Sequence, residues 1–230
     1  MIDILLMEIE HPGNLGAIAR VMANFNLKNL TLINPKCSPK DEEARNRAKH
    51  AQNILKKAKI VKKIPNYDYI VATTAKLGKD YNIPRSPLTV KEFAEKIKGI
   101  KKNSKTKIAL LIGREGIGLT NKEVLAADFV VTIPSHKKYP TLNISQACTI
   151  LFYELFQTIG KDKNTDPFNP ITKKEKDLLL KNIDEIIDKV EFSTKGKKET
   201  QHKVWKRLIN KAMLTKREAF AVFGLLKKLK

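Results

Sequence analysis

The feature that most constrains this chain is a repeated alternation of short apolar runs with longer amphipathic segments over residues 1–160. Each apolar run is bounded by turn or polar residues, as buried strands are. The runs lie at 4–7, 30–33, 69–72, 108–112 and 129–133. Helical patterns lie between and after them, near 15–25, 41–57, 91–100, 120–127 and 144–159. Strand and helix in repetition predict an α/β domain with a mainly parallel sheet.

A polar stretch with two prolines, residues 161–170, is predicted to be a linker. Residues 171–230 are predicted to form a small helical C-terminal extension, because apolar residues recur there at helical spacing, for example Leu179, Ile183, Ile186, Ile187 and Val190. About 60 residues bury too little apolar surface to be trusted as an independent fold. We therefore expect the extension to pack on the main domain or on a partner subunit.

Charge is the most informative property of the composition. The chain has 45 Lys and Arg against 24 Asp and Glu, a formal net charge of +21. Residues 161–230 hold 19 basic and 10 acidic residues, so the extension carries +9 of this charge. A field of this sign attracts polyanions, and nucleic acid is the first partner to expect. Composition alone leaves open a simpler alternative, a solvated lysine-rich surface.

Other classes of protein are disfavoured by what the chain lacks. It contains no run of 18 apolar residues, so we expect no membrane span. Its start, Met1 to Glu8, has acids where a signal peptide has a basic flank, which predicts a first strand and a cytoplasmic protein. Cys37 and Cys148 lack the spacing of metal ligands, and we expect no metal site and no disulfide framework.

The first of three local motifs follows the first predicted strand and runs from Pro12 to Arg20. Asn14 can cap the following helix. Gly16 and Arg20 are four residues apart and share a helix face, so the glycine is predicted to leave the backbone open to a substrate. The arginine would then lean back toward a positive helix terminus, a favourable place for an anion. The alternative is a capped helix with a surface arginine.

The second motif is the glycine-rich stretch Ile112-Gly113-Arg114-Glu115-Gly116-Ile117-Gly118-Leu119-Thr120. Gly113, Gly118 and Thr120 have the outer spacing of a phosphate-binding P-loop. Leu119 stands where that motif needs lysine, and Glu115 places a carboxylate where phosphates would lie. An NTP-using enzyme is therefore disfavoured, and a loop whose backbone approaches another ligand is predicted.

The third motif runs from Ile133 through a proline-bounded loop into an apolar helix. Asn143 and Gln146 have the spacing of a capping box, with asparagine in place of serine or threonine. Helix capping would by itself account for this pattern. In a functional interpretation, the backbone groups of 142–144 bind the polar edge of a ligand.

Together and in this order, the three motifs resemble the SPOUT class of RNA methyltransferases, in particular its TrmH/TrmJ branch of ribose 2′-O-methyltransferases. The resemblance covers roughly residues 1–160. It implies a cofactor site of S-adenosylmethionine in a trefoil knot, a homodimer, and tRNA as the substrate, at a cytidine or uridine of the anticodon loop. Ribosomal RNA remains the alternative substrate, and a non-catalytic basic RNA-binding protein of the same fold is the alternative function.

The resemblance also implies the site residues. The cofactor would contact Thr73, Thr74, Ala75, Gly113, Ile133, Leu142, Asn143 and Ile144. Catalysis would use Arg20, Asn14, Ser145 and Glu115. A guanidinium is a poor base, so Arg20 is expected to stabilise developing alkoxide charge or to clamp a phosphate. One departure from the family lies at Lys76 and Lys79, where members often carry arginines; lysine keeps the charge but loses the bidentate geometry.

The extension is predicted to hold the body of the tRNA. Its Trp205 is surrounded in sequence by Lys195, Lys197, Lys198, Lys203, Lys206 and Arg207. The indole could stack on a base, although an anchor for the extension's core is the favoured interpretation. The four histidines, His11, His50, His136 and His202, show no partner spacing and are interpreted as bystanders.

Overall fold

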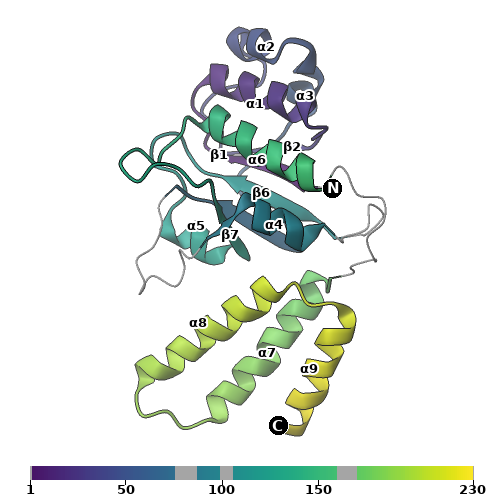
Figure 1. Cartoon of the computed structure of the whole chain (residues 1–230), viewed down its shortest axis with the longest axis vertical. Helices are drawn as coiled ribbons and strands as arrows, with labels where there is room; N and C mark the ends of the chain where they lie inside the picture. Colours follow the sequence, from purple (N-terminus) through teal and green to yellow (C-terminus); the bar gives the residue numbers. More distant parts are fainter. Residues whose placement is uncertain (1, 76–86, 99–105, 160–169, 230) are drawn as a thin grey trace. The chain divides into compact units, whose positions relative to one another are not determined.

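The computed structural model describes residues 2–75, 87–98, 106–159 and 170–229 (Figure 1). The chain divides into two compact units, residues 1–98 with 107–165, and residues 99–106 with 166–230. The predicted linker lies, except for Pro170, outside the described residues.

The first unit is built on one sheet of seven strands in the order β3-β2-β1-β6-β4-β7-β5, and every neighbouring pair is parallel. The strands are β1 (Ile2–Met7), β2 (Leu30–Ile33), β3 (Lys59–Val61), β4 (Tyr69–Thr73), β5 (Leu88–Thr89), β6 (Ile108–Ile112) and β7 (Phe129–Thr132). The central strands β1 and β6 consist almost entirely of buried apolar residues, as expected for a parallel sheet covered on both faces.

Helices cover both faces of this sheet (Figure 1). They are α1 (Pro12–Asn24), α2 (Glu42–Ala48), α3 (Gln52–Lys56), α4 (Val90–Ile97), α5 (Asn121–Ala126) and α6 (Ile144–Ile159), with a 3-10 turn at Lys49–Ala51. α6 packs against both α1 and α4, and Phe93 of α4 lies on Phe129 with ring centroids 5.6 Å apart. α5 covers the opposite face, where Val124 joins a core cluster with Leu5 and Leu111.

The prediction of an α/β parallel fold is confirmed, and all five predicted strands are present. Two short strands were missed. β3 is an edge strand in which Ile60 is largely exposed, and β5 has only two residues, so neither shows an apolar run. The predicted helix over 41–57 is broken, because the backbone of Lys49 turns to φ 51° and ends α2.

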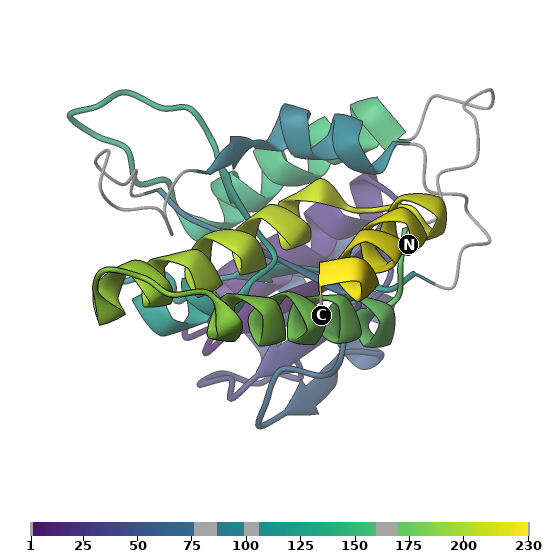
Figure 2. The ribbon, with the colours of Figure 1, turned by 90° about the horizontal axis from the view of Figure 1, so that it is seen from below.

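The second unit is a bundle of three helices, α7 (Lys173–Lys189), α8 (Lys195–Ala212) and α9 (Lys216–Leu229), in which α7 packs against both others (Figure 2). A threonine precedes each helix, and its hydroxyl accepts a backbone N–H from the first turn; these are Thr172, Thr194 and Thr215. The unit has its own small core of Leu179, Ile183, Ile187, Ile209 and Leu226.

Two residues of the extension differ from the sequence prediction. Val190 ends α7 and is half exposed, although its spacing had placed it in the apolar stripe. Trp205 is 41% exposed and lies outside the core cluster, so the interpretation of this side chain as the core anchor is wrong. The core of the extension is formed instead by smaller aliphatic side chains from three helices. Periodicity along one helix does not reveal how such side chains combine.

Candidate active site

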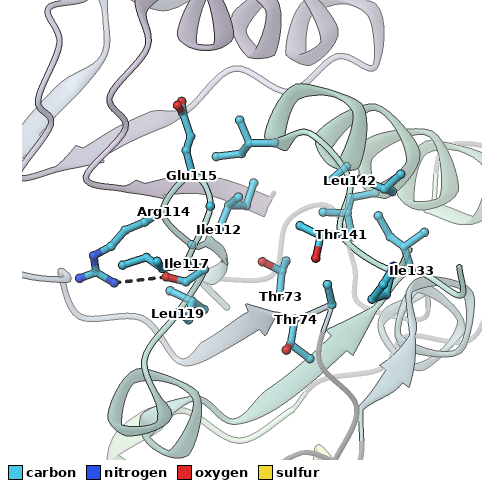
Figure 3. Close-up of a pocket in the computed structure, with 18 of the residues that line it drawn as sticks. Thr73, Thr74, Ile112, Arg114, Glu115, Ile117, Leu119, Ile133, Thr141 and Leu142 are labelled. Atoms are coloured by element: carbon cyan, nitrogen blue, oxygen red, sulfur yellow. Dashed lines mark hydrogen bonds between the residues drawn. The ribbon is translucent and has the colours of Figure 1, made fainter. Parts of the chain in front are cut away.

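A pocket opens at the edge of the sheet where β4, β6 and β7 end (Figure 3). Parallel strands bring their carboxyl ends to one edge, and ligands of open α/β sheets bind in the crevice outside that edge. Seven of the eight residues predicted to contact a cofactor line this pocket: Thr73, Thr74, Ala75, Gly113, Ile133, Leu142 and Ile144. The eighth, Asn143, is exposed and belongs to a neighbouring polar cluster described below.

The lining of this pocket suits an organic ligand better than a polyphosphate. Its walls are largely aliphatic and include Ile112, Ile133, Leu142, Ile144 and Leu151. The hydroxyl of Thr73 donates to the carbonyl of Leu111 at 3.2 Å, and the N–H of Thr74 donates to the carbonyl of Val131 at 2.9 Å. These bonds fix the end of β4 and so shape the floor of the pocket. An adenine ring between apolar walls, with its polar edge toward backbone groups, fits this donor set.

The glycine-rich loop after β6 folds back on itself. Arg114 and Gly118 exchange backbone hydrogen bonds of 3.2 and 3.0 Å, and Gly116 and Gly118 have φ of +78° and +73°. A Cβ on Gly113 would lie 2.5 Å from the carbonyl carbon of Gly118 and from the nitrogen of Leu119. The missing side chain of Gly113 therefore makes room for the loop itself, and the loop then presents its backbone to the pocket.

Arg114 is a structural residue that sequence reasoning missed. Its guanidinium donates to Glu8 at 2.7 Å and to the two carboxylate oxygens of Glu123 at 2.9 and 3.0 Å, and its side chain is only 12% exposed. The hydrogen bonds from Arg114 hold the pKa of both glutamates below its usual value of 4.5. Of the described residues that line the pocket, Arg114 is the one cation, and its carboxylate partners neutralise it. This arrangement further disfavours an NTP site.

Replacing Arg114 by methionine should lower the free energy of unfolding by about 1–3 kcal/mol at pH 7, because two carboxylates lose their donor. Because the pKa of each glutamate is lower in the folded protein than its ordinary value of 4.5, the ionised carboxylates stabilise the fold above pH 4.5. This contribution is lost as the pH falls from 4.5 through the lowered pKa of the folded state. Urea unfolding should therefore show a smaller difference from wild type at pH 4 than at pH 7. Exposed Lys122→Met is the matched control. An equal loss at both pH values would contradict this account.

The start of α1 meets the start of α6 through a chain of polar side chains. The Nδ2 of Asn143 donates to the Oδ1 of Asn14 at 3.3 Å. The Oδ1 of Asn143 accepts the N–H and the hydroxyl of Ser145 at 2.9 and 2.7 Å, which caps α6. The prediction that Asn14 caps α1 is wrong, because His11 holds that position and Asn14 lies in the first turn. Asn14 instead joins two motifs that are 129 residues apart.

Glu115 connects the glycine-rich loop to the same end of α1. Its Oε1 accepts the N–H of His11 at 3.4 Å, and its Oε2 lies 3.3 Å from the imidazole Nε2. A carboxylate at a helix N-terminus is favourable because the orphan N–H groups carry partial positive charge. The interpretation of His11 as a bystander is therefore wrong. His202 also has partners, since its Nδ1 lies 2.6 Å from Asp184 and its Nε2 3.4 Å from Asp188.

Figure 3 shows Arg114 and Glu115 leaving the loop in different directions. The side chain of Glu115 is 11% exposed, and the residue also lines the pocket. The glycine-rich loop therefore serves two structural purposes besides lining the pocket. Arg114 connects the loop to Glu8, directly after β1, and to Glu123 of α5. Glu115 connects it to His11, directly before α1.

Gly16 is buried against α2 and does not face a substrate. A Cβ there would lie 2.2 Å from the carbonyl oxygen of Ala44 and 2.7 Å from the Cβ of Arg47. The prediction that this glycine leaves the backbone open to a ligand is wrong, because α2 covers it. The motif alone does not reveal the position of α2. The absent side chain allows α1 and α2 to approach closely.

Arg20 is exposed on the same side of α1 and does not line the pocket. It borders a polar depression together with Glu42, Glu43, Asn46, Arg47 and Lys49. It forms no hydrogen bond or ion pair with any residue that the structure describes. Arg20 lies six positions after Asn14, which corresponds to about 9 Å along the helix axis. Within one chain, Arg20 therefore starts from a different turn of α1 than Asn14, and its guanidinium is free to bind an anion.

Lys76 and Lys79, where the sequence departs from the family pattern, lie outside the described residues. Within the described part of the chain, no group of three or more His, Cys, Asp and Glu residues is arranged to hold a metal ion. None of the described helices combines the length and apolarity needed to cross a membrane.

Comparison with known proteins shows the same fold and family. Residues 1–153 match the SpoU rRNA Methylase family. The chain is 36% identical to the tRNA (cytidine-2′-O-)-methyltransferase TrmJ of Methanocaldococcus jannaschii, over 99% of both chains. It is 30% identical to the enzyme of the same name from Sulfolobus acidocaldarius, over 99% of this chain and 93% of that one.

Solved structures of other proteins show the same fold. A probable methylase family protein from Haemophilus influenzae superposes with a TM-score of 0.66 at 29% identity, over 99% of this chain and 95% of that one. TrmJ from Z. mobilis shares the fold with a TM-score of 0.67, over 100% and 99% of the two chains, at 23% identity. Because the family match covers more than half of the sequence, this chain belongs to the SpoU rRNA methylase family.

Proposed function

We propose that this chain transfers a methyl group from S-adenosylmethionine to the 2′-hydroxyl of a cytidine or uridine in the anticodon loop of tRNA. The observation that carries the proposal is one pocket lined by the second and third motifs, beside which Asn14 of the first motif joins Asn143 and Ser145 in one polar cluster. The full-length relatives named as tRNA (cytidine-2′-O-)-methyltransferases favour tRNA over ribosomal RNA.

The pocket residues would hold the cofactor mainly by shape and by backbone groups. Ile133, Leu142 and Ile144 would enclose the adenine, and the strand ends at Thr73 to Ala75 and at Gly113 would supply polar backbone groups. S-adenosylmethionine supplies a methyl group already activated on a sulfonium. The protein must then align the ribose oxygen with that methyl group and accommodate the proton that leaves.

Arg20 is the residue proposed to act on the ribose. Because a guanidinium is a poor base, Arg20 would stabilise the developing alkoxide or clamp the neighbouring phosphate instead of removing a proton. Asn14 and Ser145 would hydrogen-bond the ribose or a phosphate, with Asn143 fixing both side chains. Glu115 would set the start of α1 through His11, and it makes no described contact with Arg20.

We further propose the trefoil knot and the homodimer. The loops after β4, β6 and β7 all reach one pocket, as a knotted cofactor site requires, although residues 76–86 lie outside the described part. α6 presents a face of exposed apolar side chains, Ile150, Tyr153 and Phe156. The ring centroids of Tyr153 and Phe156 lie 6.0 and 5.8 Å from that of Phe25, at the end of α1. A second copy would cover this face.

Wild-type protein should therefore sediment at twice the chain mass of 26.1 kDa. Ile150→Glu should shift it toward a monomer, because a buried unpaired charge opposes association. The control Ile60→Glu changes an exposed apolar residue on β3 and should leave the dimer intact. A monomeric wild type, or a dimer that is indifferent to Ile150→Glu, would contradict this interface.

The three-helix extension is proposed to bind the body of the tRNA through α8. This helix holds seven Lys and Arg residues against one Glu, while its Trp205 and Leu208 are 41% and 51% exposed. Changing Lys203 and Lys206 to glutamine should weaken tRNA binding and lower the slope of log K against log salt by about 0.7–0.9 for each lost phosphate contact. The same double change at Lys227 and Lys228 of α9 is the control. Equal effects of the two pairs would defeat a specific role of α8.

The substrate is tested by incubating the protein and labelled cofactor with unmodified tRNA and, separately, with ribosomal RNA fragments. Preferential labelling of tRNA in the anticodon loop supports the proposal. Labelling of ribosomal RNA alone would favour the second candidate, which the family description suggests. An RNA-modifying role also implies a cytoplasmic location. A non-catalytic RNA-binding protein would bind RNA without binding S-adenosylmethionine.

A further inference from the structure

The loop between β7 and α6 carries a short, ordered turn over residues 135–140. The hydroxyl of Ser135 donates to the carbonyl of Pro140 at 3.0 Å and closes the turn. Inside it, the N–H of Tyr139 donates to the carbonyl of His136 at 3.0 Å, and the N–H of Lys138 to the Nδ1 of His136 at 3.4 Å. These bonds give the tip a defined shape, which lowers the entropy cost of binding a ligand there.

The tip presents an aromatic ring and two cations without partners. Tyr139 is 81% exposed, more than any other large apolar or aromatic side chain in the described residues. Lys137 and Lys138 are exposed, and neither side chain forms a hydrogen bond or ion pair with a described residue. Single exposed apolar residues are common on protein surfaces. The distinguishing feature here is that the exposed ring of Tyr139 stands next to two lysines on a turn that its own hydrogen bonds hold in shape.

This turn is part of the wall of the cofactor pocket. Ile133 before it, Pro140 at its end, and Thr141 and Leu142 after it all line the pocket. Tyr139 directly precedes Pro140, so their Cα atoms are about 3.8 Å apart. The exposed tip of the turn therefore lies directly beside residues that line the pocket. Figure 2 shows the loop extending beyond the sheet and the helices that cover it.

We propose that this turn binds an unpaired segment of the RNA substrate next to the nucleotide that is methylated. Tyr139 stacks on a neighbouring base, and Lys137 and Lys138 contact the phosphates on either side. Stacking on an aromatic ring tolerates any base, because every base has a π-face, while lysine acts as a point charge for phosphate. The inference rests on the proposed function in one respect, that RNA is the substrate, and adds the surface that receives its unpaired nucleotides.

The test compares three variants with wild type by direct tRNA binding and by steady-state methylation. Tyr139→Ala should weaken tRNA binding about 5- to 150-fold and raise KM for tRNA similarly, since one stacked base is lost. Tyr139→Phe, which keeps the ring, should restore binding to within about twofold. Cofactor affinity should not change in either variant.

Lys137→Gln with Lys138→Gln should reduce the slope of log K against log salt by about 0.7 for each phosphate contact, as expected for single strands, whereas Tyr139→Ala should leave the slope unchanged. The matched control is the exposed pair Lys56→Gln with Lys57→Gln at the end of α3, which removes the same charge elsewhere. A control pair that behaves like the loop pair would overturn the assignment of phosphate contacts to this turn.

Unchanged tRNA binding in Tyr139→Ala would overturn the inference. A change in sedimentation with unchanged RNA binding would also overturn it and assign the turn to contact with a second copy of the chain. Binding is measured without methyl transfer, so the two proposals can fail separately. A wild type that binds tRNA through Tyr139 but transfers no methyl group would support the turn and refute the proposed function.

Discussion

Replacing Arg20 by alanine should lower the turnover number of methyl transfer about 100- to 1000-fold, which is the effect of removing one charge-stabilising donor from a transition state. The guanidinium forms no hydrogen bond or ion pair with a described residue, and Arg20 does not line the cofactor pocket. Affinity for S-adenosylmethionine and the unfolding midpoint should therefore stay close to wild type. Steady-state kinetics with tRNA, calorimetry with the cofactor and thermal unfolding measure the three quantities.

Arg20→Lys separates two ways in which this residue could act. Lysine keeps the charge but cannot form the planar bidentate contact, so a clamp on phosphate predicts a loss almost as large as that of alanine. Simple stabilisation of negative charge predicts partial recovery. Arg45→Ala removes an exposed arginine from the neighbouring α2 and serves as the control. Near-normal turnover in Arg20→Ala would remove the central catalytic assignment.

Gly113→Ala should abolish measurable cofactor binding, with a loss in affinity of at least about 100-fold, or about 2.7 kcal/mol. The added Cβ would lie 2.5 Å from backbone atoms of Gly118 and Leu119, and neither can move aside as a flexible side-chain end could. The loop must open, and it forms one wall of the pocket. Overpacking of this kind should also cost about 1–3 kcal/mol of stability.

Gly116→Ala provides the control for this prediction. Its φ of +78° disfavours alanine, but nothing lies within 4 Å of the added Cβ. We expect a cost of about 1 kcal/mol from backbone strain and a much smaller loss of cofactor affinity. Calorimetry and urea unfolding of both variants measure the difference. Equal cofactor affinities in Gly113→Ala and wild type would show that the loop does not shape the site.

Periodicity predicted five of the seven strands of the sheet. Five of its strands are buried on both faces and appear as continuous apolar runs, while β3 and β5 are too short or too exposed to do so. The break at Lys49 was not predictable, because a positive φ at lysine depends on its surroundings and leaves no mark in the helical pattern.

The motifs indicated which residues meet but often not why. Gly16 was interpreted as an opening for a ligand, yet its missing side chain makes room for α2, and the missing side chain of Gly113 likewise makes room for the loop's own backbone. Arg114 pairs with Glu8, and Glu115 pairs with His11. These partners lie 106 and 104 residues away in the sequence, so no local spacing reveals them. The pairing of Asn14 with Asn143 likewise depends on the packing of α1 against α6. Such contacts follow from the tertiary fold rather than from sequence windows.

The most direct test of the central claim is titration with S-adenosylmethionine, followed in the same preparation by transfer of a labelled methyl group to unmodified tRNA and alkaline hydrolysis of the product. A methyl group on the ribose blocks the 2′-oxygen that alkali needs for cleavage. The account predicts cofactor binding and label in an alkali-resistant dinucleotide. Label in ordinary mononucleotides would place the methyl group on a base, and failure to bind the cofactor would contradict the assignment as a methyltransferase.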